Sequence, residues 1–238
     1  MLLPVLLLLF GQAPPVLVQP RDALHLVVES RFTYMASTRP TTYERWIAEN
    51  MTYEKSGNWI IIIRGDRAVR WVIDTQKRTY SETPVAPQRE PAKPGTATED
   101  IHSAGFDYEP EFAWTVTKTA ETATMHGRNC GKTSAEGIAD FAGIRMDLWL
   151  CRSKEPSLES KANAPLIDMA RLRYENPATF LRDFLSRQPD MVLMSLEATV
   201  DPPIAPRMIH QVRVLTFEKA PAPPGIFDLP SGLQKMIP

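Results

Sequence analysis

Hydrophobic and polar residues alternate with a period of two along most of the chain, which is the pattern of β-strands with one buried face. The clearest segment is 24–34, where apolar and polar side chains fall on opposite faces: Leu26, Val28, Phe32 and Tyr34 against Glu29, Arg31 and Thr33. Turn-forming residues separate further strands expected at 42–55, 59–63, 67–74 and 78–81. We therefore predict an antiparallel meander over residues 24–81.

The second half of the chain adds more strands and two helical signals. Strands are expected at 112–117, 122–130, 144–151, 191–199 and 208–219. Asn176 followed by Pro177 is a typical helix start, and the apolar residues after it share one side of a helix that ends before Pro189. A weaker helix is expected at 164–174. The pattern predicts a mainly β protein with a few helices, of the α+β class.

Proline marks two segments as lying outside regular strands. Four prolines fall between Pro84 and Pro94, and more follow in the segment 223–230. Because proline cannot donate to a sheet ladder, we expect an exposed loop at 84–105. The segment 223–230 is expected to be extended and to lay its apolar residues against the rest of the domain.

The first 20 residues contain none of the chain's 27 Lys and Arg or 28 Asp and Glu residues. The apolar run Leu2–Phe10 is too short to cross a bilayer as a helix, which needs about 20 residues, but it has the length of a secretory h-region. Gly11 and Ala13 offer the small residues of a cleavage site. We predict a secretory signal at 1–20, a single domain at 21–238 and a periplasmic or secreted location. A buried first strand and an uncleaved anchor are the alternatives.

Cys130 and Cys151 are the two cysteines of the chain. If they face each other in an antiparallel hairpin, its turn centres on residues 140–141, with Gly137 and Gly143 on either side. Facing residues lie about 4.5–5.5 Å apart, within reach of a disulfide, and disulfides persist in exported proteins. We therefore predict a Cys130–Cys151 disulfide; the alternative is two buried free thiols.

Motifs of reactive residues are missing from the sequence. The chain contains no nucleophile elbow, no HExxH and no CxxC, and its four histidines stand far apart. The segment His126–Thr133 ends in Gly-Lys-Thr, but its glycine spacing is one residue too short for a phosphate-binding loop. We expect no catalytic residue, no metal and no cofactor. A hydrolase built on His126 or His210 is the less favoured alternative.

The tryptophans suggest an apolar ligand. All five fall in expected strands, and a curved sheet lined with large side chains can hold an acyl chain, although the same residues also suit a filled core. The net charge of −1 gives no basic surface for nucleic acid. The residues that we expect to bind the ligand are Trp59, Ile61, Ile63, Trp71, Trp114 and Trp149.

Several segments resemble the LolA/LolB-type periplasmic lipoprotein-carrier superfamily. They are the strand and turn at 66–74 before Lys77–Tyr80, the late strand with Trp149 and the ending Ile226–Pro230. The resemblance covers most of residues 22–236. It implies a curved antiparallel half-barrel sheet with two helices packed on or in its concave face, and a concavity that binds lipid or acyl chains. The 84–105 loop departs from the pattern of that superfamily.

We therefore expect an exported, non-enzymatic binding protein that holds an apolar ligand or acyl chain in a half-barrel. Its expected partners are an apolar small molecule, a lipid or an acylated protein, with peripheral contact to the cell envelope and none with nucleic acid. The alternative is an envelope structural, sensor or interaction domain whose core is filled by its own side chains.

Overall fold

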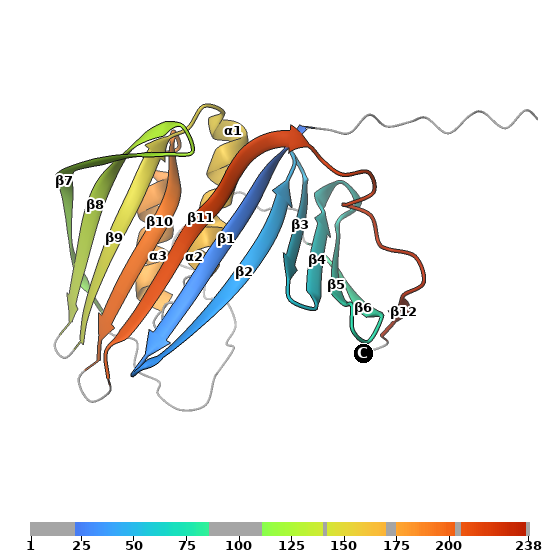
Figure 1. The fold of residues 1–238 in the computed structure, drawn as a ribbon, viewed down its shortest axis with the longest axis horizontal. Coiled ribbons are helices and arrows are strands. Elements are labelled where there is room, and N and C mark those ends of the chain that lie inside the picture. Colours follow the sequence, from blue (N-terminus) through green and yellow to red (C-terminus); the bar gives the residue numbers. More distant parts are fainter. Residues whose placement is uncertain (1–21, 86–110, 140–141, 170–174, 203–205, 237–238) are drawn as a thin grey trace, which may run out of the picture.

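The computed structural model describes residues 22–85, 111–139, 142–169, 175–202 and 206–236. The strands in these ranges form one curved, open sheet in the order β12-β6-β5-β4-β3-β2-β1-β11-β10-β9-β8-β7 (Figure 1). The N-terminal strands are β1 (Asp22–Tyr34), β2 (Ser37–Ile47), β3 (Met51–Ser56), β4 (Trp59–Arg64), β5 (Val69–Asp74) and β6 (Thr79–Pro84). The later strands are β7 (Ala113–Met125), β8 (Arg128–Ala139), β9 (Ala142–Arg152), β10 (Met191–Asp201), β11 (Met208–Pro221) and β12 (Gln234–Lys235).

The mainly β, α+β fold class is confirmed, with one correction to the strand pairing. Neighbouring strands of the sheet are antiparallel except for the short β12, which runs parallel to β6. The sheet is therefore mixed. The two expected helices are present as α2 (Asn163–Met169) and α3 (Glu175–Ser186). A shorter helix, α1 (Pro156–Glu159), and two single-turn 3-10 segments, Gly65–Arg67 and Ser160–Ala162, complete the fold.

The helices cover one face of the sheet, behind the strands in the view of Figure 1. We call this side the helix face and the opposite side the front face. Leu166 of α2 and Leu181 of α3 are fully buried in the same core as Met146 and Leu148 of β9. Burying one such side chain contributes roughly 1.5–3 kcal/mol. The space between these helices and the sheet is therefore occupied by the protein's own side chains.

The C-terminal segment packs on the front face over the N-terminal strands. Phe227 is buried beside Trp46 of β2, and Leu229 packs against Ile62 of β4 and Trp71 of β5. The expectation that this segment lays its apolar residues against the domain is confirmed, but the expectation that it is extended is wrong. It forms turns, in which the amide of Ile226 donates to the carbonyl of Pro223 and the amide of Asp228 to that of Gly225. The helices and the C-terminal segment therefore pack on opposite faces of the sheet.

The meander contains one strand more than its pattern predicts. The segment 42–55 is not one strand but is divided between β2 and β3. The turn between them contains no glycine or proline, and Asn50 is its common turn residue. The amide of Ala48 donates a 2.9 Å hydrogen bond to the carbonyl of Met51 within the turn, and the amide of Gly65 donates a 2.7 Å hydrogen bond to the carbonyl of Asn50 from outside it. A Cβ on Gly65 would lie 2.9 Å from that oxygen.

The expected strand at 122–130 is wrong, because it contains the turn of the β7–β8 hairpin. That turn lies at His126 and Gly127, whose φ angles are +49° and +67°. Gly137, which we expected next to a turn, lies inside β8 and faces Trp114 of β7. A Cβ at Gly137 would approach the Trp114 ring to 2.8 Å, so this glycine makes room for the indole.

Cys130 and Cys151 face each other in the β8–β9 pair and form a disulfide, with their Cα atoms 4.1 Å apart. The register that places them opposite each other is the one that the sequence predicts. The signal at 1–20 and nearly all of the loop at 84–105 lie outside the described residues.

Candidate functional site

The sheet divides between β10 and β11. These strands pair from Val200 and Met208 only as far as Ser195 and Arg213. Beyond that point β10 continues alongside β9, and β11 continues alongside β1. The two strands therefore form a V-shaped fork, which is visible between the labels β10 and β11 in Figure 1.

Two β-bulges lie at this fork. Met194 is an extra residue of β10 relative to its partner β9, and Leu215 is an extra residue of β11 relative to β1. An extra residue bends its strand and increases the local twist, and bulges of this kind often lie beside functional sites. The bulges bend β10 and β11 close to the point where the two strands separate from each other. Met194 and Leu215 both line the cavity at the fork.

The tip of the β7–β8 hairpin covers the fork. Residues 119–121 of β7 oppose the single residue Lys132 of β8, and this irregularity bends the hairpin. Figure 1 shows its upper end crossing β9 and β10. At the tip, Nε2 of His126 donates a 3.1 Å hydrogen bond to the backbone carbonyl of Val214, just past the point where β11 leaves β10.

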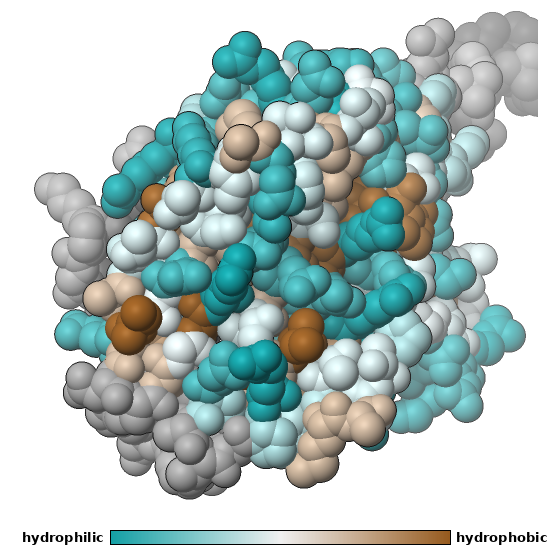
Figure 2. Space-filling model, turned by 60° about the vertical axis from the view of Figure 1, so that its left-hand side comes forward, coloured by the Kyte–Doolittle hydropathy of each residue, from teal (hydrophilic) through white to brown (hydrophobic). Residues whose placement is uncertain are grey.

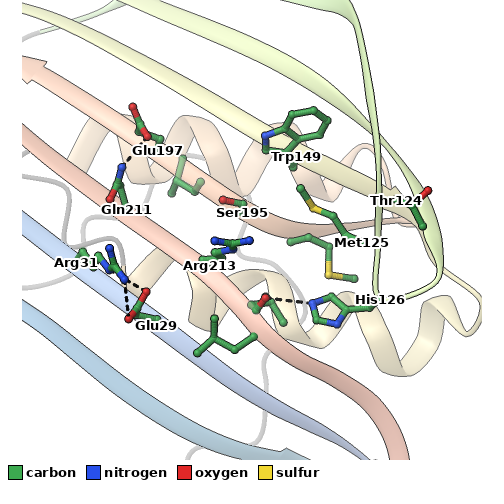
Figure 3. Close-up of a pocket in the computed structure, with 14 residues that line it drawn as sticks. Glu29, Arg31, Thr124, Met125, His126, Trp149, Ser195, Glu197, Gln211 and Arg213 are labelled. Atoms are coloured by element: carbon green, nitrogen blue, oxygen red, sulfur yellow. Dashed lines mark hydrogen bonds and ion pairs between the residues drawn. The ribbon is translucent and has the colours of Figure 1, made fainter.

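A cavity of about 670 Å³ lies on the front face between the hairpin tip and the sheet (Figure 3). Its floor consists of two rows of residues that face one another across neighbouring strands. The first row is Trp149, Ser195, Arg213 and Glu29, and the second is Glu197, Gln211 and Arg31. Thr124, Met125 and His126 contribute from the hairpin tip. The cavity thus combines an apolar wall with a polar floor.

The second-row side chains Gln211 and Arg31 each bind a carboxylate of the floor. Nε2 of Gln211 donates a 2.8 Å hydrogen bond to Glu197, and the Arg31 guanidinium pairs with Glu29 at 2.8 Å. In contrast, Trp149, Ser195 and Arg213 have no side-chain hydrogen bond or ion pair to any described residue, and Figure 3 draws no dashed line to them. Three of the four first-row residues therefore present polar groups that have no partner among the described residues.

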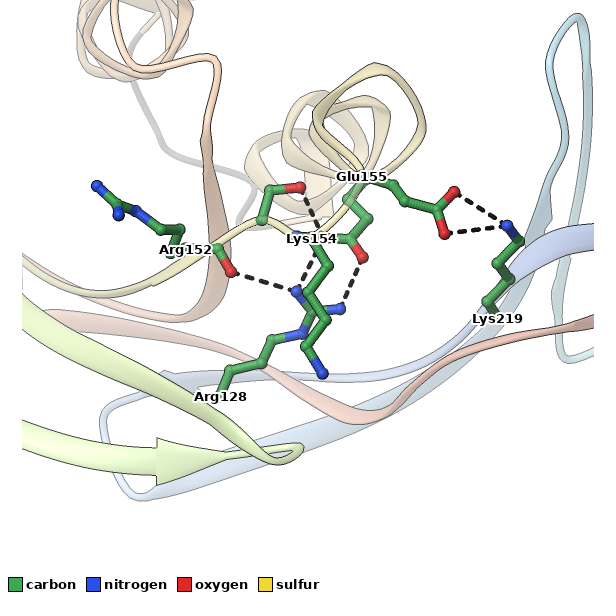
Figure 4. Close-up of polar contacts among 7 residues, drawn as sticks. Arg128, Arg152, Lys154, Glu155 and Lys219 are labelled. Carbon is green, nitrogen blue, oxygen red and sulfur yellow. Dashed lines mark hydrogen bonds and ion pairs between the residues drawn. The ribbon is translucent and has the colours of Figure 1, made fainter.

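A buried ion pair fixes the hairpin tip to the helix face (Figure 4). Arg128, next to the turn, donates hydrogen bonds of 3.0 and 2.6 Å to the two carboxylate oxygens of Glu159 in α1. The two side chains are only 10% and 7% exposed. The Arg128 guanidinium also lies 4.9 Å from the centre of the Phe217 ring. These contacts hold the covering hairpin in place from behind the fork.

Glu159 accepts four hydrogen bonds from described residues. Oγ of Ser153 donates at 2.7 Å and the amide of Lys154 at 3.0 Å, in addition to Arg128. Burial by itself would raise the pKa of Glu159, but these donors and the nearby guanidinium outweigh it and lower the pKa below its ordinary value. The carboxylate is therefore ionised at neutral pH and is part of the structure.

The structure does not bring the six expected ligand-binding residues together. Trp149 lines the fork cavity. Trp59, Ile61 and Ile63 lie on β4, on the helix face of the far half of the sheet, and Trp59 is 50% exposed. Trp71 is on the opposite face, buried beneath the C-terminal segment.

Trp114, the remaining expected residue, lies at the β7 edge on the helix face. Its ring stacks on Phe180 of α3, with the ring centres 4.1 Å apart, and its Nε1 donates a 3.2 Å hydrogen bond to Asn176. The two histidines considered for a hydrolase are also separated. His126 lies at the fork cavity, whereas His210 is buried against Phe32 on the helix face. Trp114 and His210 therefore contribute to packing.

Most of the cavity lining, including Ser195, Arg213 and Met125, was not predicted from the sequence. The burial pattern of β11 carries one sign of the fork. Buried residues of β11 follow even numbers from Met208 to Val214, and the next buried position is Phe217. This change of phase marks the bulge at Leu215, because one extra residue shifts every later side chain to the other face.

The described residues contain neither a metal-binding cluster nor a membrane-spanning helix. No group of three or more His, Cys, Asp or Glu side chains is arranged to hold a metal ion within these ranges. None of the described helices has the length and apolar character needed to span a membrane.

On the side of the molecule in Figure 2, hydrophobic residues form small patches between hydrophilic ones. The apolar groups on that side are therefore dispersed.

No protein-family model and no curated protein matches the chain. Solved structures similar to it include a LolA superfamily protein from Nitrosomonas europaea, with 9% identity, 88% of this chain and 91% of that chain covered, and a TM-score of 0.32. A putative outer membrane lipoprotein-sorting protein domain from Vibrio parahaemolyticus gives 7% identity, 87% and 89% coverage and a TM-score of 0.27. The LolA superfamily is the one that the sequence segments resemble.

A further similar structure is PNGF-II, with 8% identity, 90% of this chain covered and a TM-score of 0.34. This chain spans only about 30% of the length of PNGF-II. Identities below 10% and TM-scores of this size support no functional argument.

Proposed function

We propose that this protein is a non-enzymatic binding module that holds the apolar part of a small molecule, such as an acyl chain, in the cavity at the β10–β11 fork. The observation that carries this proposal is the cavity itself. It has about 670 Å³ of space, within the range of small-molecule sites, and it is open to solvent without any movement of the core.

The apolar wall of the cavity suits a flexible chain. Met125 and Met194 approach from the hairpin and the sheet, Leu215 lies at the bulge, and Trp149 contributes an indole face. Methionine side chains adapt their shape to a ligand, and tryptophan provides a large rigid surface. The helix face offers less support for such a ligand, because its core residues are already packed against one another.

A neutral apolar dye tests this proposal. N-phenyl-naphthylamine, whose fluorescence rises in apolar surroundings, should bind the purified protein with one saturable site. Met125→Glu should abolish most of that binding, because it places a charge in the apolar wall. Met35→Glu is the matched control, since Met35 is an exposed methionine outside the cavity lining. Absence of saturable binding, or equal loss in both variants, would refute the proposed function.

The filled core favours a second candidate function, an interaction domain without a small-molecule ligand. The helices and the C-terminal segment each cover part of the sheet with buried apolar residues. A protein that binds no dye but is recovered in a stable complex with another envelope protein would support this candidate over the first.

We also propose that the protein is exported to the periplasm or secreted, where it meets a lipid or an acylated protein. Two features support this: the charge-free segment 1–20 and the Cys130–Cys151 disulfide, which is typical of oxidising compartments. Fractionation of cells that produce the full chain with a C-terminal tag provides the test. Recovery of uncleaved, reduced protein in the cytosol would contradict export.

A further inference from the structure

Three hydrogen-bond donors stand side by side on the floor of the fork cavity. Trp149 of β9 faces Ser195 of β10, and Ser195 faces Arg213 of β11, so the three residues form one row across three neighbouring strands. Strands are about 4.8 Å apart, which makes the row about 10 Å long. The row ends at the fork, where Ser195 and Arg213 are the last pair that joins β10 to β11.

None of the three side chains has a hydrogen-bond partner among the described residues. Trp149 offers an indole N–H and Arg213 a guanidinium, both of which can only donate, and Ser195 offers a hydroxyl that can donate. The row is thus complementary to a group that accepts hydrogen bonds. An oxyanion with two or three oxygens is the chemical group that fits adjacent donors including a guanidinium.

The charges around the row leave Arg213 without a counter-ion in the described lining. Glu29 also faces Arg213, but its two oxygens are held by Arg31, at 2.8 and 3.2 Å. Glu197 accepts its hydrogen bond from Gln211 at 2.8 Å. Both carboxylates of the cavity are therefore bound by second-row side chains, Glu29 by Arg31 and Glu197 by Gln211, and a bound anion would supply the counter-charge that Arg213 lacks.

We propose that Trp149, Ser195 and Arg213 bind the oxyanion head group of a single-chain amphiphile whose apolar chain lies against Met125, Met194 and Leu215. This assignment rests on the proposed function, because it names the ligand class of the same cavity. It selects an anionic ligand, with a carboxylate or phosphate head, over a neutral one of the same chain length.

Competition against the neutral dye tests the assignment. Laurate, dodecanol and inorganic phosphate are each titrated into the protein–dye complex. Laurate should displace the dye at roughly tenfold lower concentration than dodecanol, the factor expected for a hydrogen-bonded charge. Inorganic phosphate should compete weakly, because it lacks the chain.

Two matched substitutions test whether Arg213 supplies the charge that binds the head group. Arg213→Met should weaken laurate binding roughly tenfold and leave dodecanol binding unchanged. Arg145→Met removes the same charge from an exposed side chain of β9 that does not line the cavity, and it should change neither affinity. Far-UV circular dichroism of each variant confirms that the sheet is retained.

The possible outcomes separate the two proposals. Equal competition by laurate and dodecanol, or equal effects of Arg213→Met and Arg145→Met, would overturn the head-group assignment while leaving the apolar cavity in place. Tight phosphate binding without any effect of the chain would overturn the amphiphile class. Failure of the unmodified protein to bind the dye would refute the proposed function itself.

Discussion

Replacing Glu159 by glutamine should strongly destabilise the fold, although the two side chains have nearly the same shape. The carboxylate of Glu159 accepts four hydrogen bonds, two from Arg128, one from Ser153 and one from the amide of Lys154. A glutamine has one oxygen, so its NH₂ group would face at least one of these donors. The substitution therefore removes a charge and also creates a donor–donor contact.

The magnitude follows from the burial of the pair. Removing one partner of a buried ion pair costs about 3–5 kcal/mol, because the other charge stays buried without compensation. Arg128 would keep its 3.2 Å hydrogen bond to the carbonyl of Arg152 and its contact with the Phe217 ring. We therefore expect the lower end, about 3 kcal/mol of lost unfolding free energy.

Glu155→Gln is the matched control for this prediction. Glu155 lies four residues away and pairs with Lys219 at 2.9 and 3.0 Å, but these side chains are 46% and 43% exposed (Figure 4). An exposed pair contributes about 0–1 kcal/mol. Urea unfolding followed by tryptophan fluorescence at pH 7 measures both variants. A loss below about 1 kcal/mol for Glu159→Gln, or the same loss for both variants, would show that burial does not control the strength of this pair.

Three further predictions concern stability. The pKa of Glu159 is lowered in the folded state, so its contribution is complete above the ordinary value of 4.5 and is lost as the pH falls further. The stability difference between the native protein and Glu159→Gln should therefore shrink in urea titrations below pH 4.5, and a constant difference down to pH 3 would contradict this. Replacing Cys130 and Cys151 together by alanine should cost about 3 kcal/mol, because the bridge closes a loop with a sequence separation of 21; an unchanged urea midpoint would rule this out. Gly137→Ala should lower the thermal midpoint through a clash with the Trp114 ring, at about 1–3 kcal/mol, and adding Trp114→Ala should abolish the clash, so independent effects of the two changes would argue against it.

Strands such as β1 and β9 could be predicted from the sequence because they bury one face. In β1 the apolar residues Leu26, Val28 and Phe32 alternate with polar residues, and the register that joins Cys130 to Cys151 follows from simple pairing. The division of segment 42–55 was not predicted, because its turn contains no glycine or proline and is held in part by the amide of Gly65, which lies outside the segment. Local patterns cannot report a contact that forms only after the chain has folded.

The fork was harder to predict for a related reason. Strand alternation shows which residues share a face, but not where one strand stops pairing with its neighbour. The bulges at Met194 and Leu215 and the bend of the β7–β8 hairpin interrupt the period of two, and the cavity lies where these interruptions meet. Of the six residues chosen for their size and apolar character, only Trp149 lines it. Trp71 is buried beneath the C-terminal segment, Trp114 stacks on Phe180, and the three residues of β4 lie on the helix face.

The two faces of the sheet differ in the free energy that a ligand would need to enter. Binding beneath the helices would require α2 and α3 to lift away and expose side chains such as Leu166, Leu181 and Leu185, which are buried in the core. Exposing each costs roughly 1.5–3 kcal/mol, so several kcal/mol would be subtracted from the affinity. The fork cavity already lies open beside the hairpin tip, which Arg128 and Glu159 hold in place. A ligand there keeps its full binding energy, and for this reason we place the site on the front face.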